Sequence, residues 1–410
     1  MIKHPQELSI QDFSYDLPDH RIARYPLAER DQSKLLVYRE GIIQEDLYAN
    51  LADHLPANSL LAFNNTKVVE ARLLFEKPNG SKIEIFCLEP HESYGDITSA
   101  MLQKGKVLWK CLVGGAKKWK EGTLIAQIKR SDSARLALTA RKVEQLTDAY
   151  LIELSWDDPH LSFAELLHIA GVIPLPPYLN RQAEETDQER YQTIYAKHDG
   201  SVAAPTAGLH FTDSLFDKLS KKNISHAFIT LHVGAGTFKP VKSETMQHHE
   251  MHAEFIDVTA VFIQTLLQQL TDPVIAVGTT SLRTLESLYW LGVKTILYPA
   301  ISPESLTLTQ WEAYSLADKH ISTADALNAL LSWLQQHHTD RLITRTQIII
   351  APGYVFRVVK GLVTNFHQPQ STLLLLVAAI TGNNWRNIYQ YALDHDFRFL
   401  SYGDGSLLWL

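Results

Sequence analysis

The sequence has few of the residues from which disulfide frameworks and structural zinc sites are built. It contains two cysteines in 410 residues, Cys87 and Cys111, which lie 24 positions apart without a second pair. A disulfide scaffold or a zinc ribbon needs more cysteines at closer spacing. We therefore expect both cysteines to fill small spaces in a core.

Long hydrophobic runs are also missing. The longest, residues 373–380, is far below the ~20 residues that a bilayer requires. The first five residues contain no apolar segment of the kind found in signal peptides. We expect a cytoplasmic protein without a membrane segment.

Several common catalytic motifs do not occur. The sequence has no Gly-x-Ser-x-Gly elbow, no Walker loop and no Gly-x-Gly-x-x-Gly opening a βαβ unit, which disfavours the usual hydrolase, NTPase and dinucleotide-binding classes. His248 and His252 have the i, i+4 spacing of two metal ligands on a helix, but no His-Glu-x-x-His motif or nearby cysteine completes a ligand set. We interpret them as a surface pair and predict no metal site.

The net charge is −7, so a uniformly basic surface is excluded, but one window has the opposite sign. Residues 101–145 contain eleven lysines or arginines and three acidic residues, a balance of +8. Such a window is typical of a nucleic-acid contact, although a solvated sheet face would look the same. The lysines that we predict to make this contact are Lys104, Lys106, Lys117, Lys118 and Lys120.

Two kinds of hydrophobic pattern divide the chain. Short β-type runs separated by Gly, Pro, Asn and Ser fill residues 60–155 and predict six or seven strands, which favours a small β-barrel. Those runs are residues 60–63, 68–75, 82–88, 107–113, 123–128, 135–139 and 150–156. Later, helical patterns at 211–221 and 258–270 are each followed by an apolar strand, at 226–232 and 274–277, as in α/β layers.

These patterns predict an α/β layered domain with an inserted small β-barrel domain. The α/β part would comprise residues 1–60 and 157–410, and the barrel, with its basic surface, residues 61–156. Within the α/β part, residues 294–344 are expected to be helical, with an amphipathic helix at 324–334. This stretch could serve as a lid, a dimer surface or inert decoration.

Polar and small residues gather where predicted strands of the α/β part end. Since ligands of open α/β sheets bind at the carboxyl ends of strands, we take these segments as candidate site loops. They are residues 203–212, 231–238, 277–286, 352–357 with 365–367, and 401–404. Each segment alone would equally suit a tight turn, a helix cap or a hairpin.

Taken in order, however, these segments resemble the S-adenosylmethionine:tRNA ribosyltransferase-isomerase family over nearly the whole chain. The resemblance is carried by Tyr15-Asp-Leu-Pro18, Pro26-Leu-Ala-Glu-Arg-Asp31, Phe63-Asn-Asn-Thr-Lys-Val68, Ile173-Pro-Leu-Pro-Pro-Tyr178, Glu189-Arg-Tyr-Gln-Thr193 and the candidate site loops. It implies a monomeric two-domain enzyme. S-adenosylmethionine would be a co-substrate, tRNA the partner, and no true cofactor would be needed.

The resemblance also implies a reaction. A proton next to the sulfonium of S-adenosylmethionine is removed, adenine is expelled, and the amine of an aminomethyl-deazaguanine at the tRNA wobble position attacks the opened sugar. An epoxide then closes as methionine leaves, which gives epoxyqueuosine in the tRNA. Acids and bases are needed at separate steps.

We assign candidate residues to these roles. The proposed acids and bases are His210, His232, His367 and Asp404, the last of which would protonate or orient departing adenine. Arg283 would hold the methionine carboxylate or a phosphate, Thr279 and Thr280 the ribose, and Tyr178 or Tyr402 would stack on a base. The remaining substrate-binding candidates are Thr206, Gly208, Gly234, Thr237 and Asn365. Each of these could instead be a structural residue of its motif.

The chain departs from the family pattern in two places that bear on function. Val172 stands where the family commonly has a histidine, and residues 294–344 are about fifty more than the pattern contains. Two alternatives therefore stay open. One is a relative that binds S-adenosylmethionine but methylates or otherwise modifies another RNA or base, and the other is a noncatalytic RNA-binding relative.

Overall fold

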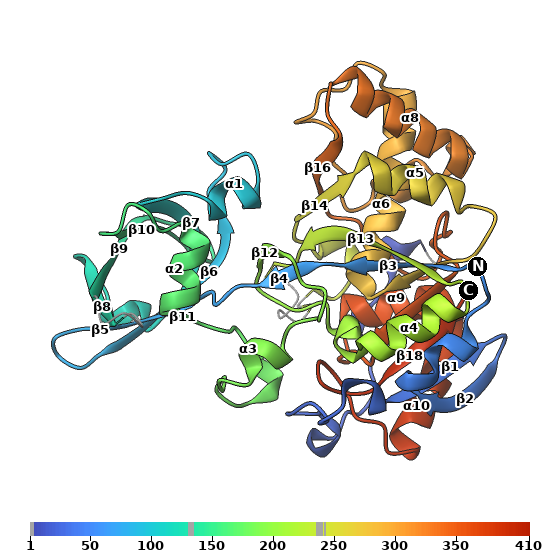
Figure 1. Ribbon diagram of the computed structural model, residues 1–410, viewed down its shortest axis with the longest axis horizontal. Helices are drawn as coiled ribbons and strands as arrows, with labels where there is room; N and C mark the ends of the chain where they lie inside the picture. Colours follow the sequence, from blue (N-terminus) through green and yellow to red (C-terminus); the bar gives the residue numbers. More distant parts are fainter. Residues whose placement is uncertain (1–3, 130–134, 235–240, 242) are drawn as a thin grey trace.

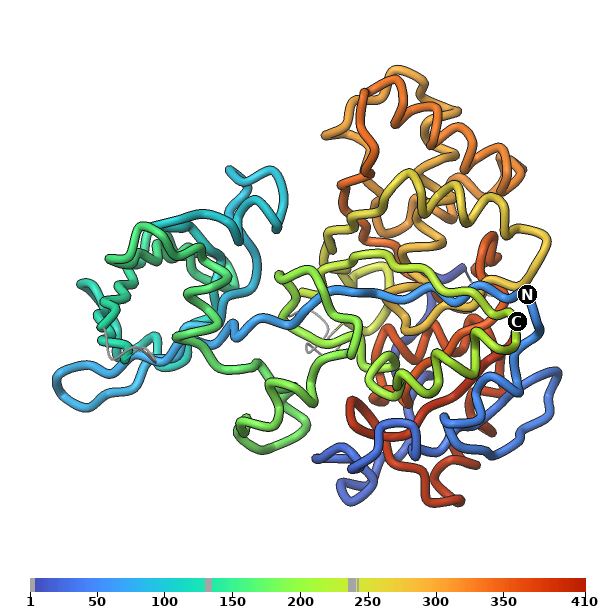
Figure 2. The backbone as a smooth tube through the Cα atoms, viewed as in Figure 1, coloured from blue at the N-terminus to red at the C-terminus, as the bar shows by residue number. Residues whose placement is uncertain are grey.

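Two β-sheets organise the computed structural model, which describes residues 4–129, 135–234, 241 and 243–410. Figure 1 shows the smaller sheet standing apart from the larger sheet and its helices. The backbone trace shows that the chain passes from the larger sheet into the smaller one and back (Figure 2). Among the described residues, no helix is long and apolar enough to cross a membrane.

The larger sheet has nine strands in the order β16-β14-β13-β3-β15-β17-β18-β1-β2. Their bounds are β1 Lys34–Arg39, β2 Ile42–Leu47, β3 Leu60–Asn64, β13 Ser225–His232, β14 Glu254–Thr259, β15 Val274–Val277, β16 Arg341–Thr346, β17 Gly361–Asn365 and β18 Gly405–Trp409. The four central strands, β13, β3, β15 and β17, are parallel, so their carboxyl ends meet at one edge.

Helices cover both faces of this sheet. Successive residues of β3 point to opposite faces. Leu60 and Ala62 pack in the cluster formed with α5, α6 and α8, whereas Leu61 and Phe63 pack in the cluster formed with α4. The helices are α4 Asp213–Lys221, α5 Ala260–Gln268, α6 Thr279–Leu297, α8 Thr323–Gln336, α9 Thr372–Thr381 and α10 Trp385–Asp394. The mixed α/β content predicted from the sequence is confirmed.

The smaller sheet is antiparallel, with the strand order β11-β5-β6-β7-β10-β9-β8. Its strands are β5 Arg72–Glu76, β6 Lys82–Pro90, β7 Lys106–Gly114, β8 Leu124–Lys129, β9 Arg135–Gln145, β10 Tyr150–Trp156 and β11 Gly171–Val172, with α1 Ile97–Met101 and α2 Phe163–Ala170 beside them. β5 and β8 come close to each other, as the rolled trace in Figure 2 shows, but among the described residues β8 pairs only with β9. Since β5 and β8 are not paired in the described part of the chain, the sheet is not a closed barrel.

One strand that we assigned to the smaller sheet belongs to the larger one. The apolar run at 60–63 forms β3, at the centre of the nine-stranded sheet. All five residues of β3 are buried, so its sequence has no alternation that would distinguish it from a strand of the smaller sheet. The chain enters the smaller sheet only after β4, Thr66–Val68, which pairs with β12, His198–Ser201.

Candidate active site

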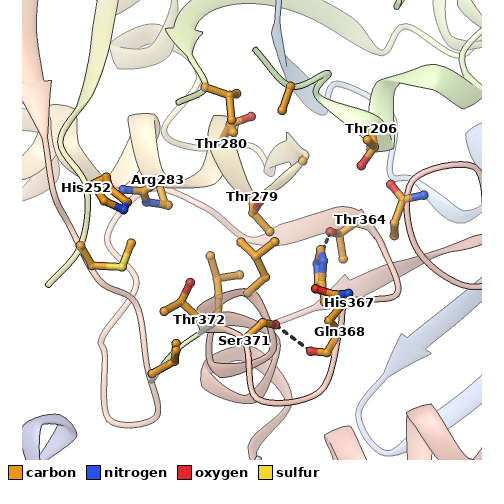
Figure 3. Close-up of a pocket in the computed structure, with 18 of the residues that line it drawn as sticks. Thr206, His252, Thr279, Thr280, Arg283, Thr364, His367, Gln368, Ser371 and Thr372 are labelled. Carbon is orange, nitrogen blue, oxygen red and sulfur yellow. Dashed lines mark hydrogen bonds between the residues drawn. The ribbon is translucent and has the colours of Figure 1, made fainter. Parts of the chain in front are cut away.

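A cavity of about 400 Å³ opens where β13, β15 and β17 end. This volume is in the range of small-molecule sites, and the position is the one at which open α/β sheets bind ligands. Seven of the predicted substrate-binding residues and one predicted catalytic residue line it, namely Tyr178, Thr206, Gly234, Thr279, Thr280, Arg283, Asn365 and His367. Figure 3 shows the side chains of Thr206, Thr279, Thr280, Arg283 and His367 around the same space.

The first turn of α6 forms one wall. Gly278 adopts a φ of +88°, a conformation that favours glycine, and its N–H donates to the carbonyl of Val363 at 2.8 Å. This turn of the chain lets α6 begin at the end of β15. The side chains of Thr279 and Thr280 follow directly, and Thr280 Oγ1 accepts a hydrogen bond from Asn64 Nδ2 at 3.3 Å. The N-terminus of a 19-residue helix therefore faces the cavity with hydroxyl groups and a partial positive charge.

Arg283 lies one turn further along α6, with 7% of its surface exposed. Its Nη1 donates to Glu254 in a buried ion pair, and its Nε donates to the carbonyl of Ile348 at 3.1 Å. Its Nη2 has no hydrogen-bond partner in the protein. A buried guanidinium N–H without a partner is costly, so this atom is available to an anionic group of a ligand.

The end of β17 forms the opposite wall. His367 Nε2 and Thr364 Oγ1 are 2.9 Å apart, and the main-chain N–H of His367 donates to the hydroxyl of Tyr389 at 3.0 Å. Burial lowers the pKa of His367 to about 3. At neutral pH this ring is therefore uncharged and acts through hydrogen bonds.

The other two predicted catalytic histidines do not line the cavity. His210 stacks on Tyr48 with ring centres 4.1 Å apart, and burial lowers its pKa to about 3. His232 lies 3.2 Å from Thr66 Oγ1, packs against Gly200, and has its pKa lowered to about 4, mainly by burial. The usual pKa near 6.5, which suggested proton transfer at neutral pH, is absent at all three histidines because the fold buries them.

Asp404 is also outside the cavity lining. Its carboxylate accepts hydrogen bonds from the main-chain N–H groups of Lys34 and Arg398, at 3.0 and 2.7 Å, and from the Arg398 guanidinium at 3.0 Å. These contacts tie the start of β18 to β1. Asp404 is thus engaged by the protein itself.

The remaining predicted residues are placed as follows. Tyr402 donates to Asp187 at 2.8 Å and lines a separate cavity of about 20 Å³, together with His210. Gly208 packs so closely against Tyr195 that a Cβ atom would lie 1.9 Å from its hydroxyl oxygen. Thr237 lies outside the described residues. Ser401 lines both cavities.

Two segments that line the cavity were not predicted from the sequence. One is the stretch 248–252, which crosses the cavity beside Arg283, as Figure 3 shows for His252. His248 ends a short 3-10 helix and His249 is extended, so the i, i+4 pair has no common helical face. The other segment is 368–373, where Ser371 caps α9. The polar sequence Gln-Pro-Gln-Ser-Thr directly before an apolar helix is the feature from which this segment could have been predicted.

The loop 352–357, one of the candidate site loops, contacts α6 instead. The fully buried carboxylate of Glu286 on α6 accepts hydrogen bonds from the N–H groups of Arg357, Val358 and Val359, each at 3.0 Å, and from the Tyr354 hydroxyl at 2.8 Å. The loop therefore fixes α6, and through it the position of Arg283.

We expect Glu286→Leu to lower the free energy of unfolding by roughly 3–5 kcal/mol, because four buried donors lose their acceptor. Urea denaturation measures this change. The exposed Glu304→Gln is the matched control and should leave the midpoint unchanged. An unchanged midpoint for Glu286→Leu would contradict the assigned structural role.

The five predicted nucleic-acid lysines are all exposed, but they form two groups at opposite ends of β7. Lys104 and Lys106 lie at its start, and Lys117, Lys118 and Lys120 follow its end. The nine residues of β7 separate the groups by about 27 Å. Two other cations of the basic window form ion pairs within the sheet, Lys110 with Glu89 at 2.9 Å and Arg141 with Glu153 at 3.0 Å.

Comparisons with known proteins agree over the length of the chain. The family model described as queuosine biosynthesis protein matches residues 10–408. The S-adenosylmethionine:tRNA ribosyltransferase-isomerase of Chlorobaculum parvum is 36% identical over 408 residues, covering 98% of this chain and 100% of its own. Those of Pelobacter propionicus and Trichlorobacter lovleyi are each 38% identical and cover 97% of this chain and 99% of their own.

One solved structure, an S-adenosylmethionine tRNA ribosyltransferase from Thermotoga maritima, is 26% identical, covers 97% of this chain and 99% of its own, and has a TM-score of 0.45. The family assignment rests on the sequence relatives and the family model. With a match across residues 10–408 and relatives above 30% identity over nearly the full length, the chain belongs to the queuosine biosynthesis protein family of S-adenosylmethionine:tRNA ribosyltransferase-isomerases.

Proposed function

We propose that the chain transfers and isomerises the ribosyl part of S-adenosylmethionine onto 7-aminomethyl-7-deazaguanine at the wobble position of tRNA. The products are epoxyqueuosine-tRNA, adenine and methionine. The enzyme acts as a cytoplasmic monomer, consumes S-adenosylmethionine as a co-substrate and holds no further cofactor.

The observation that carries this proposal is the buried pair of Arg283 and Glu254 on the cavity wall. S-adenosylmethionine carries an α-amino-acid group, in which a carboxylate and an ammonium lie side by side. The unpartnered Nη2 of Arg283 suits the carboxylate, and the neighbouring carboxylate of Glu254 suits the ammonium. Thr279 and Thr280, one turn earlier on the same helix, are in reach of the ribose.

The proton-transfer roles are divided by position. His367, the one predicted catalytic histidine on the cavity wall, faces the reacting sugar as a neutral acceptor, and its own partner is Thr364. His210 and His232 hold the residues around the cavity, and Asp404 fixes the strands behind it. Tyr178, which lines the cavity, is the residue that stacks on a base.

In this proposal the smaller sheet, from β5 to β11, forms a barrel-like module that binds tRNA. The chain before and after it forms the catalytic domain, with an insertion at 294–344. The two lysine groups at either end of β7 would contact separate stretches of the RNA backbone. The two groups are about 27 Å apart along β7, which is too far for both to contact the same phosphate.

Replacing Lys117, Lys118 and Lys120 together by alanine should weaken tRNA binding about tenfold or more, and lower the slope of log K against log salt by roughly 2. Filter binding at several salt concentrations measures both quantities. Lys110→Ala removes a cation that is already paired with Glu89 and should bind like the parent protein. Equal salt slopes for the triple variant and the parent would argue against this surface.

Product analysis separates the proposal from the alternatives. Adenine and methionine indicate ribosyl transfer, S-adenosylhomocysteine indicates a methyltransferase, and unchanged S-adenosylmethionine indicates a noncatalytic relative. The unpartnered Arg283 Nη2 favours a site that still binds its ligand.

A further inference from the structure

The amide of Asn365 has one atom without a partner. Its Nδ2 donates to the carbonyl of Leu400 at 3.2 Å and lies 3.3 Å from His210 Nε2, so both of its hydrogens are used. Its Oδ1 has no hydrogen-bond partner, although the residue is only 3% exposed. Asn365 lines the cavity. An unpaired buried acceptor is costly, so the site is complete only when a ligand supplies an N–H or O–H donor.

The orientation of this amide is determined by its neighbours. Only the NH₂ side can face the carbonyl of Leu400, because two carbonyl oxygens would repel each other. His210 Nδ1 lies 3.4 Å from the carbonyl of Arg30, so that nitrogen carries the proton and Nε2 is the acceptor. Burial and the nearby Arg398 and Arg30 lower the pKa of His210 to about 3, which keeps Nε2 free to accept from Asn365 at neutral pH.

We propose that Asn365 determines specificity by accepting a hydrogen bond from the 6-amino group of the adenine of S-adenosylmethionine, and that His210 is a positioning residue that holds the amide for this contact. The proposal rests on the proposed function. It assigns to His210 an action through Asn365 in place of direct proton transfer.

The choice of adenine follows from another unpartnered atom of the wall. Arg283 Nη2 offers a charged donor, which suits the carboxylate at one end of S-adenosylmethionine. Figure 3 shows Arg283 and the Thr364–His367 pair, the latter at the end of β17, separated across the cavity. Adenine is at the opposite end of the molecule from the carboxylate. A ligand anchored at Arg283 thus directs its adenine toward β17 and the acceptor of Asn365.

The test is a cycle of two enzymes and two substrates. S-adenosylmethionine and its analogue with purine in place of adenine, which lacks only the 6-amino group, are each supplied with saturating substrate tRNA. The release of adenine or purine gives kcat/KM for the parent protein and for Asn365→Ala. For each enzyme, kcat/KM with S-adenosylmethionine is divided by kcat/KM with the purine analogue. Comparing this ratio between the two enzymes cancels the different leaving tendencies of the two bases. We expect the parent to prefer adenine about 10- to 100-fold more strongly than Asn365→Ala does.

Two variants at position 210 test the positioning role. His210→Phe keeps a ring to stack on Tyr48 but removes the acceptor, so the preference for adenine should fall toward that of Asn365→Ala. His210→Gln offers an acceptor again and should restore part of the preference, which a merely structural role would not do. Asn384→Ala is the control, because that amide donates to Tyr38 away from the cavity.

Equal preferences in the parent and Asn365→Ala, with adenine released normally, would overturn the assignment of Asn365 and leave the proposed function intact. A preference that survives in His210→Phe would overturn the positioning role. Release of neither base by the parent would overturn this inference and the proposed function together.

Discussion

Arg283→Met is expected to lower kcat/KM for S-adenosylmethionine roughly 100-fold or more, mainly through a higher KM. The variant loses a charged hydrogen bond in a buried site. Such a bond typically contributes about 3 kcal/mol to the free energy of binding. Methionine keeps the length and apolar stem of the side chain, so the change is one of charge and hydrogen bonding. Steady-state release of adenine at varied S-adenosylmethionine concentration measures the effect.

The same substitution leaves Glu254 buried without its cation, which lowers stability by itself. Arg283→Met with Glu254→Met removes both charges and should recover most of the stability but none of the activity. Arg283→Lys retains the charge without the planar fork that contacts Glu254 and Ile348, so activity should stay low. A KM close to that of the parent in Arg283→Met would show that the ligand is anchored elsewhere.

Stability should fall steeply between pH 7 and pH 5. Burial lowers the pKa of His210 and His367 to about 3 and that of His232 to about 4, from about 6.5 in the unfolded chain. As the pH falls through 6.5, the unfolded chain therefore takes up protons at these three histidines that the folded chain does not bind. Each histidine lowers the free energy of unfolding by roughly 1.4 kcal/mol per pH unit in this window, or about 2 kcal/mol by pH 5.

The three together correspond to roughly 6 kcal/mol, a large part of the stability of an ordinary protein. Burial raises the pKa of Glu286, so the folded state holds this proton to a higher pH than the unfolded chain does, and this effect has the opposite sign. Urea unfolding at several pH values gives the slope. His367→Gln should reduce the slope of the free energy of unfolding against pH by the contribution of about one proton. His160→Gln, at an exposed position, should not change this slope. A slope near zero between pH 5 and 6.5 would contradict neutral, buried histidines.

Periodicity predicted the elements that have clear patterns. The strand expected at 274–277 is β15, and the amphipathic helix expected at 324–334 lies within α8. The convergence of the 203–212, 277–286 and 365–367 segments was also predictable, since the carboxyl ends of parallel strands meet at one edge. The run at 60–63 was placed in the wrong sheet because a fully buried strand carries no alternation.

The roles of single residues were less predictable because they depend on which neighbours surround them. Nothing in the sequence indicates that His210 points behind the cavity wall toward Tyr48, or that the oxygens of Asp404 are occupied by Lys34 and Arg398. Burial changes a histidine from a proton carrier near neutral pH into an uncharged hydrogen-bonding group. The stretch 248–252 was missed because His248 and His252 were interpreted as a surface pair.

The most direct test supplies the protein with S-adenosylmethionine and with tRNA that bears 7-aminomethyl-7-deazaguanine at the wobble position. Free adenine and the mass of the modified nucleoside are then measured. We expect adenine in equal amount to a nucleoside with the mass of epoxyqueuosine. Intact S-adenosylmethionine, or S-adenosylhomocysteine with a methylated nucleoside, would contradict it.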